Sequence, residues 1–261
     1  MPAAAAPDRS RSFRARSHDR FWWHRLRSTD YVPPLYASLA EEEWAVMEGW
    51  FAETGAEARI AEINVPAMSL VSGLVGGSGV TRIVQLGHYY GYSALLLGFL
   101  LRTMAPDPPR PLLRTVDLDP AASAFTARWI GAAGLERHVE VVTGDSADPQ
   151  GPQEAERALG GPLELLLVDS SHAYGHTLAE LDLWAPHVPV GGLVALHDAA
   201  PFAAGFDPTS DGGVHRALSE WLPGREGWSG MVLNAHAQPQ TDGNALVYKD
   251  ACGLGLLQRV A

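Results

Sequence analysis

The sequence predicts an α/β fold with a doubly wound, mostly parallel β-sheet. Short apolar runs alternate with longer amphipathic segments from residue 82 to residue 222. Strands that alternate with helices in this way form a parallel sheet with right-handed crossovers. After the fifth strand–helix unit come three short strand-like pieces, near 230–235, 245–249 and 253–259, and two of them can extend the sheet.

The N-terminal part of the chain departs from this alternation. We interpret residues 1–35, rich in arginine, as a flexible basic and aromatic arm, and residues 36–261 as the folded domain. Ser38 is expected to cap a helix whose apolar face includes Trp44 and Trp50. After this helix, a loop at 62–66 leads to a helix at 67–74, and glycines at 76–79 separate that helix from the first strand of the sheet.

From residue 82 onward, each apolar run reads as a strand buried on both faces. Strands are predicted at 82–86, 112–117, 139–143, 163–168 and 193–197. Helices are predicted at 92–103, 120–133, 152–159, 173–184 and 214–222. A loop rich in Pro, Gly and Asp, residues 199–213, precedes the last of these helices.

The most informative stretch is the turn between the first strand of the sheet and its helix. The apolar run breaks at Gly87, and the chain becomes helical after Gly91. Such a turn lets a ligand approach the backbone and leaves the first N–H groups of the helix free. The second strand ends in Asp117, whose carboxylate can accept hydrogen bonds from ribose hydroxyls. Together these features predict a nucleoside cofactor at the carboxyl edge of a Rossmann-like sheet.

The spacing of the glycines separates candidate cofactors. A dinucleotide site has the pattern G-x-G-x-x-G, whereas this turn has only Gly87 and Gly91, with the bulky His88, Tyr89 and Tyr90 between them. An NAD(P)-dependent oxidoreductase is therefore disfavoured and is kept as an alternative.

The loop Leu86-Gly-His-Tyr-Tyr-Gly-Tyr-Ser93 resembles that of class I S-adenosylmethionine (SAM)-dependent methyltransferases, especially small-molecule O-methyltransferases of the macrolide, sugar and catechol types. The resemblance implies a seven-stranded sheet closed by an antiparallel C-terminal strand. It also implies SAM as the cofactor and methyl transfer to a hydroxyl of a small, natural-product-like acceptor. One departure is Gln85, which stands where the family usually has an acidic residue.

The resemblance implies a role for each residue of the turn. Gly87, Tyr89 and Gly91 would line the methionine portion of SAM, and Ser93 at the helix start would bind its carboxylate. Asp117 would hold the ribose hydroxyls.

Further SAM contacts are expected outside the turn. The stretch that contains Asn64 and Val65 would cover the methionine portion, and Asp145 and Ser146 would hold the adenine amino group. Asp169, at the end of the fourth strand, would lie beside the sulfonium.

Catalytic groups follow two strand ends. Asp169 and His172 follow the fourth strand, and His197 and Asp198 end the fifth, so all four face the same crevice. Methyl transfer requires an aligned nucleophile that is basic enough to attack. In some of the resembled enzymes a histidine three residues after an aspartate is the base. This implies His172 and Asp169 as catalytic residues, and it is favoured over the alternative that His172 caps or packs at the start of the helix at 173–184.

A divalent metal is a further expectation of the resemblance. Asp169, His197 and Asp198 would meet around Mg²⁺, or Mn²⁺ because of the histidine. The catechol type has an Asn where this chain has Ala199, and the macrolide type has a carboxylate in place of His197. The site therefore has fewer hard ligands than either type, and the need for a metal stays open.

Composition limits the other function classes. A net charge of −11 argues against nucleic acid as a partner. No apolar run approaches the roughly 18–20 residues that span a bilayer, and no signal peptide is evident, so we expect a cytoplasmic protein without a membrane partner. Cys252 is the single cysteine, which excludes an internal disulfide.

We expect an enzyme that acts on a small-molecule substrate and forms a homo-oligomer, a dimer. A SAM-binding protein with an isomerising or accessory role is the other alternative.

Overall fold

The computed structural model describes residues 32–261. Most of the expected N-terminal arm therefore lies outside the described residues. The chain divides into two compact units, one ending at Ala61 and the other spanning Glu62–Ala261. Each unit is described by itself.

The first unit contains α2 (Pro34–Ala37) and α3 (Glu41–Ala56). The expectation that Ser38 caps the longer helix is wrong. Because the Pro33–Pro34 pair starts a short helix of its own, Ser38 closes α2, and its N–H bonds to the Pro34 carbonyl. The N-cap of α3 is Ala40, whose N–H donates to the Glu43 carboxylate at 2.8 Å.

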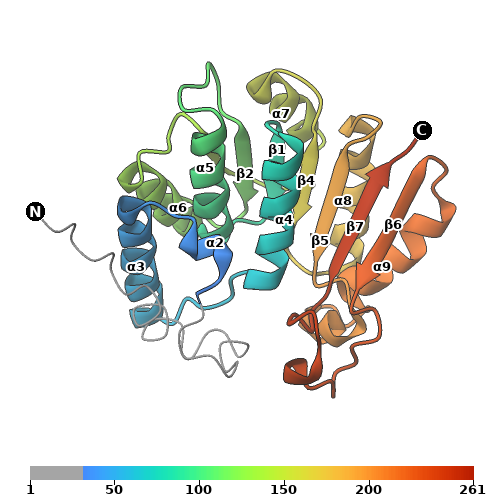
Figure 1. The fold of residues 1–261 in the computed structure, drawn as a ribbon. Coiled ribbons are helices and arrows are strands. Elements are labelled where there is room, and N and C mark those ends of the chain that lie inside the picture. The colour runs from blue at the N-terminus through green and yellow to red at the C-terminus, as the bar shows by residue number, and fades with distance from the viewer. Residues whose placement is uncertain (1–31) are drawn as a thin grey trace, which may run out of the picture. The chain divides into compact units, whose positions relative to one another are not determined.

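The second unit is built on one seven-stranded sheet with the order β3-β2-β1-β4-β5-β7-β6 (Figure 1). Its strands are β1 (Ile83–Leu86), β2 (Leu113–Asp117), β3 (Val139–Thr143), β4 (Leu165–Val168), β5 (Leu193–His197), β6 (Trp228–Leu233) and β7 (Leu254–Arg259). The first five strands pair in parallel, and β7 pairs antiparallel with both β5 and β6. The predicted mostly parallel sheet with an antiparallel C-terminal strand is confirmed.

The helices cover both faces of this sheet. They are α4 (Val65–Ser78), α5 (Tyr92–Met104), α6 (Pro120–Ala132), α7 (Gly151–Leu159), α8 (Tyr174–Trp184) and α9 (Gly213–Trp221). Short 3₁₀ turns are η2 (Ala185–His187), η3 (Pro201–Phe206), η4 (Leu222–Gly224) and η5 (Gly243–Ala245). In Figure 1, α4 and α5 lie in front of the sheet, and α8 and α9 lie behind it.

The central strand β1 shows why this sheet is stable. Val84 and Leu86 belong to a buried cluster with apolar side chains of α7, α8 and α9, including Trp184. Successive side chains of a strand point to opposite faces, so Ile83 and Gln85 face α4 and α5. All four residues of β1 are fully buried, as expected for a parallel strand covered on both sides.

Two other predicted elements differ from the structure. The apolar piece at 245–249 was expected to be a strand, but η5 and an irregular loop occupy it. The Asn234 side-chain amide binds the carbonyls of Tyr248 (2.8 Å) and Asp250 (2.6 Å), which are then not available to a strand ladder. In addition, α4 continues through two glycines to Ser78 and ends at Gly79, whose φ of 70° is left-handed.

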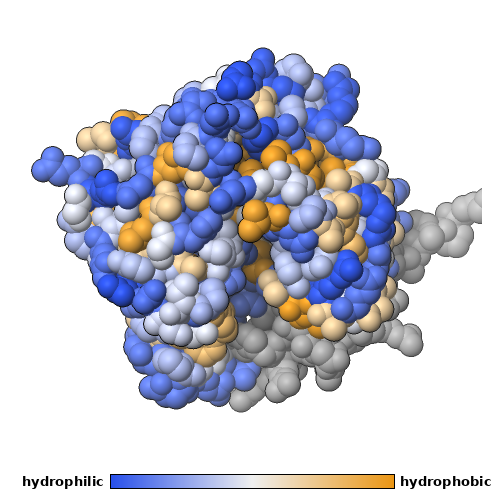
Figure 2. Space-filling view, turned by 180° about the vertical axis from the view of Figure 1, so that it is seen from behind, coloured by the Kyte–Doolittle hydropathy of each residue, from blue (hydrophilic) through white to orange (hydrophobic). Residues whose placement is uncertain are grey.

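The surface in the described part of the chain is mixed in character. Figure 2 shows hydrophobic residues in several small patches among hydrophilic ones on one face of the molecule. Scattered exposed apolar side chains are ordinary for a globular protein. Within residues 32–261, no helix combines the length and the hydropathy needed to cross a membrane.

Candidate active site

The predicted site residues lie at one edge of the sheet because the parallel strands end there. Leu86 at the end of β1 is in register with Val116 of β2 and with Val168 of β4, and Val168 is in register with Leu196 of β5. Segments that follow these strands are therefore neighbours despite their separation in sequence. The site has two parts, a cofactor loop (residues 87–91) and a carboxylate–histidine cluster (Asp169, His172, His197 and Asp198).

Both glycines of the cofactor loop are required by close packing against other parts of the chain. Gly87 has a φ of 83°, and a Cβ there would lie 2.1 Å from the Asp169 carbonyl oxygen. Gly91 has a φ of 88°, and a Cβ there would lie 2.7 Å from Thr126 Cγ2. The close passage of the segment that follows β4 and of α6 therefore requires both glycines, in addition to any approach of a ligand to the backbone.

Asp117 holds the cofactor loop against the end of β2. Its Oδ2 accepts the backbone N–H groups of His88 at 3.0 Å and Tyr89 at 2.7 Å. Its Oδ1 accepts the N–H of Asp119 at 3.0 Å. The carboxylate therefore has a structural task in the protein itself, in addition to any role with ribose.

His88 points into the protein. Its ring lies between the hydroxyls of Thr115 and Ser123, each 3.1 Å away, and the residue is buried. Burial lowers the pKa of His88 to about 4, against the opposing effect of Asp117 and Asp119. The ring is therefore neutral at physiological pH and anchors the loop.

Gln85 and Ser93 form the base of the loop. Gln85 Nε2 donates to the Gly87 carbonyl at 2.8 Å and to Ser93 Oγ at 2.6 Å. Because Ser93 Oγ accepts this bond, its own O–H is left to donate elsewhere. The amide at position 85 thus donates two hydrogen bonds. An ionised carboxylate, which only accepts, could donate neither.

Beyond β3, Ser146 belongs to a polar network that the sequence analysis did not predict. Its hydroxyl lies 2.9 Å from His176 Nε2, which also faces the fully buried Glu180 at 3.2 Å. A hydrogen bond that His176 donates to the Glu180 carboxylate raises the pKa of His176, although burial opposes it. Ser170 donates to the other Glu180 oxygen at 2.8 Å. The network connects the loop after β3 to the loop after β4. The neighbouring Asp145 accepts the N–H of Ala147 at 2.8 Å.

The residues predicted to cover the methionine portion of SAM begin α4. Val65 is buried, and Asn64 occupies the N-cap position without capping the helix through its side chain. Instead, Asn64 Nδ2 donates to Asp250 Oδ1 at 2.9 Å. Asp250 is fully buried and lies 3.2 Å from His197 Nε2, so Asn64 is connected to the carboxylate–histidine cluster.

The cluster brings together every residue predicted for catalysis and metal binding. His172 Nε2 lies 3.2 Å from Asp198 Oδ2 and 3.6 Å from Asp169 Oδ1. His197 Nδ1 lies 3.3 Å from Asp169 Oδ1. His172 and Asp198 both have a φ of 59°, a left-handed conformation that side chains other than glycine rarely adopt and that is often found at functional sites.

Opposite charges in the cluster shift its pKa values. Burial alone would lower the pKa of His197, but Asp198, Asp169 and Asp250 raise it well above 6.5. Burial alone would raise the pKa of Asp169, yet His197 and His172 hold it below its usual 3.8. The pKa of His172 is raised as well, because its bonds to the carboxylates outweigh the effect of burial.

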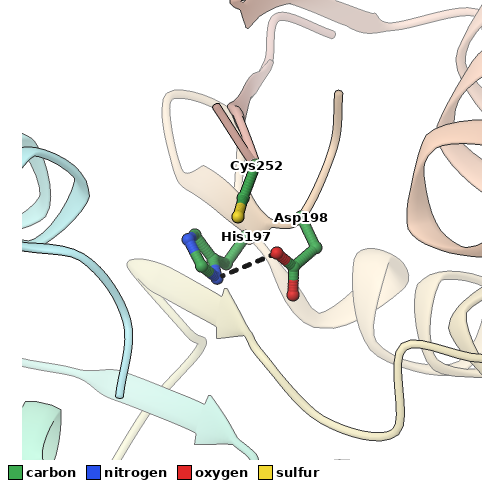
Figure 3. A group of neighbouring side chains, drawn as sticks. All are labelled: His197, Asp198 and Cys252. Carbon is green, nitrogen blue, oxygen red and sulfur yellow. Dashed lines mark ion pairs between the residues drawn. The ribbon is translucent and has the colours of Figure 1, made fainter. Parts of the chain in front are cut away.

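His197 has a carboxylate at each ring nitrogen, Asp169 at Nδ1 and Asp250 at Nε2. An imidazole that donates from both nitrogens has no lone pair left for a metal. The role of His197 as a metal ligand therefore stays a prediction that this arrangement does not favour. Figure 3 shows His197 beside Asp198 and Cys252, a group whose ligand atoms lie within 4.8 Å of one another.

A second group of possible metal ligands consists of Asp169, His172 and Asp198, and it is more exposed than the group of His197, Asp198 and Cys252. One ligand atom each from Asp169, His172 and Asp198 lies within 4.8 Å of the others. Carboxylate oxygens suit Mg²⁺, and one imidazole nitrogen shifts the preference toward Mn²⁺. The donor set therefore fits a divalent metal.

Asp250 and Cys252 are site residues that sequence reasoning missed. They precede β7, and the antiparallel register pairs His197 with Leu254. That register brings the residues before Leu254 beside those that follow His197. No local pattern marks them, because their position depends on how β7 pairs.

Comparison with known proteins shows what this part of the chain is similar to. Residues 84–199 match the family described as Methyltransferase domain. The matched segment includes the cofactor loop and the carboxylate–histidine cluster, and it is similar to a methyltransferase domain.

Solved structures share the fold of this domain at low sequence identity. An O-methyltransferase from Bacillus cereus in complex with SAH has a TM-score of 0.65 at 19% identity, over 82% of this chain and 90% of that one. The O-methyltransferase TomG from Streptomyces achromogenes, involved in tomaymycin synthesis and solved with SAM, has a TM-score of 0.61 at 22% identity, over 86% and 92%. No curated protein matches the sequence.

Proposed function

We propose that this protein is a SAM-dependent O-methyltransferase whose acceptor is a hydroxyl of a small molecule. The observation that carries the proposal is the carboxylate–histidine cluster, which holds the partly exposed His172 in the segment that is similar to a methyltransferase domain. The two solved structures named above are both O-methyltransferases, with SAH and SAM bound, which supports the same reaction.

The residues around the cofactor loop fit SAM. The O–H of Ser93, not used by Gln85, would donate to the methionine carboxylate. Asp117 would accept from the ribose hydroxyls with the lone pairs that its three backbone bonds leave. The negative charge of Asp169, maintained by its two histidine neighbours, would attract the sulfonium.

His172 is proposed as the base. Its Nε2–H would donate to Asp198, which leaves the lone pair on Nδ1, a nitrogen that no described residue bonds. SAM supplies a methyl carbon activated by the sulfonium. The acceptor oxygen forms the new bond to this carbon as the carbon–sulfur bond breaks, and His172 takes the hydroxyl proton. Asp198 and Asp169 orient the ring and stabilise the imidazolium that results.

A divalent metal is a second way in which the same three side chains can activate the acceptor. Bound by Asp169, His172 and Asp198, it would act as a Lewis acid on the acceptor hydroxyl. His172 would then be a ligand and not a base. Activity retained in excess EDTA would assign the base role, whereas loss of activity restored by Mg²⁺ or Mn²⁺ would assign the ligand role.

The proposal is tested by incubating the full chain with SAM and a panel of alcohols, phenols and sugars, and by detecting SAH and methylated product by mass spectrometry. SAM affinity is measured in parallel by calorimetry. Binding of SAM without SAH formation would favour the SAM-binding, non-methylating alternative. Binding of NAD(P) instead of SAM would favour the oxidoreductase alternative.

A further inference from the structure

Tyr248 has a buried hydroxyl with no hydrogen-bond partner in the described part of the chain. A buried tyrosine hydroxyl normally finds a partner, because leaving a buried donor unpaired costs free energy. Near an active site, a group of the bound ligand is the natural partner for such an orphaned donor.

Tyr248 lies in the loop between β6 and β7, which meets the sheet at the edge where the parallel strands end. The pairing of His197 with Leu254 fixes this position. Asn234 clamps the loop by donating from its side chain to the carbonyls of Tyr248 and Asp250. These bonds anchor Tyr248 two residues before Asp250, which bonds His197 in the cluster.

The charges of the cluster act on the phenol. Burial and the Asp250 carboxylate raise the pKa of Tyr248, and His197 partly opposes them. At physiological pH the hydroxyl is therefore protonated, so it is available as a donor to a neutral oxygen. The Asp250 carboxylate disfavours an anionic partner.

The order of the strands indicates which ligand this donor meets. The cofactor loop and Asp117 follow β1 and β2, on one side of β4, whereas β5 and β7 lie on the other side. SAM bound at the cofactor loop with its sulfonium beside Asp169 leaves the β5–β7 side to the acceptor.

We propose that Tyr248 is a specificity-determining residue that donates a hydrogen bond to a second, uncharged oxygen of the acceptor, near the hydroxyl that is methylated. The inference rests on the proposed function and deepens it. The acceptor class is a small molecule with two neighbouring neutral oxygens, such as a diol or a hydroxy-ketone.

The test compares Tyr248→Phe with wild type on acceptor pairs that differ by one oxygen, catechol with phenol and trans-1,2-cyclohexanediol with cyclohexanol. We expect kcat/KM to fall about 3- to 10-fold for the two-oxygen member, the usual effect of one neutral hydrogen bond, and less than about twofold for the other. SAM affinity should be unchanged. Because the hydroxyl has no protein partner, the thermal midpoint of the variant should equal or exceed that of wild type.

The matched control is Tyr174→Phe, which removes an exposed phenol hydroxyl bonded to Glu220. It should affect both members of each pair equally. Equal losses on both members in Tyr248→Phe, weaker SAM binding, or a lowered thermal midpoint would each overturn the inference. Wild type that binds SAM but methylates no two-oxygen probe would overturn the acceptor class. Wild type that does not bind SAM would instead refute the proposed function.

Discussion

The cofactor loop and the carboxylate–histidine cluster lie at the same edge of the sheet but are built differently. Neutral hydrogen bonds and backbone N–H groups hold the cofactor loop, with the Asp117 carboxylate as a charged anchor. The cluster consists of charged side chains with a fully buried partner, Asp250. Replacements in the loop should therefore weaken binding in small steps, whereas replacements in the cluster should remove chemistry outright.

The largest effect is expected in the cluster. His172→Ala should lower kcat about 10²- to 10⁴-fold, the usual contribution of a general base, and leave the calorimetric Kd for SAM unchanged. His187→Ala, which removes a histidine paired with Glu156 away from the cluster, is the matched control and should keep full activity. Near-normal turnover in His172→Ala would show that the cluster does not supply the base.

The next effect is expected at the charged anchor of the loop. Asp117→Ala should weaken SAM binding about 10- to 100-fold, because two loop N–H groups and the ribose lose a charged acceptor. With SAM at saturation, kcat should change little. The control is Asp119→Ala, which removes a nearby carboxylate that caps α6. If both variants bind SAM equally well, the ribose assignment is mistaken.

The two parts also differ in how much of each could be predicted from the sequence. The loop and the residues after β4 and β5 are encoded by short local patterns, and parallel pairing brings those patterns to one edge. Asp250 carries no such signal, because it reaches His197 only through the register of β7. The apolar piece that includes Tyr248 was expected to be a strand, since the distant amide of Asn234 that holds its carbonyl cannot be read from local periodicity.

A structural carboxylate beside the cluster gives the third prediction. Asp207 accepts the N–H groups of Tyr174 and Gly213, at the first residues of α8 and α9, and both donors of Thr209. Burial would raise the pKa of Asp207, but these bonds hold it below its usual 3.8. The carboxylate therefore stabilises the fold above pH 3.8, and this contribution is lost as pH falls further toward the lowered pKa.

Asp207→Asn should lower the thermal midpoint at neutral pH by about 2–8 °C, because an amide oxygen accepts fewer and weaker bonds. The difference from wild type should shrink below pH 3.8 when melting is followed by circular dichroism. A constant difference at all pH values would mean that the charge of Asp207 does not stabilise the helix starts.

The smallest effect is expected for a neutral group of the cofactor loop. Ser93→Ala removes one uncharged donor to the SAM carboxylate and one acceptor of Gln85, so the Kd for SAM should rise only about 3- to 10-fold. Gln85 keeps its bond to the Gly87 carbonyl, and the loop should therefore hold its shape, with kcat at saturating SAM unchanged. An increase in the Kd for SAM as large as that of Asp117→Ala would contradict this expectation. It would mean that a single neutral bond in the loop contributes as much to SAM binding as the charged anchor does.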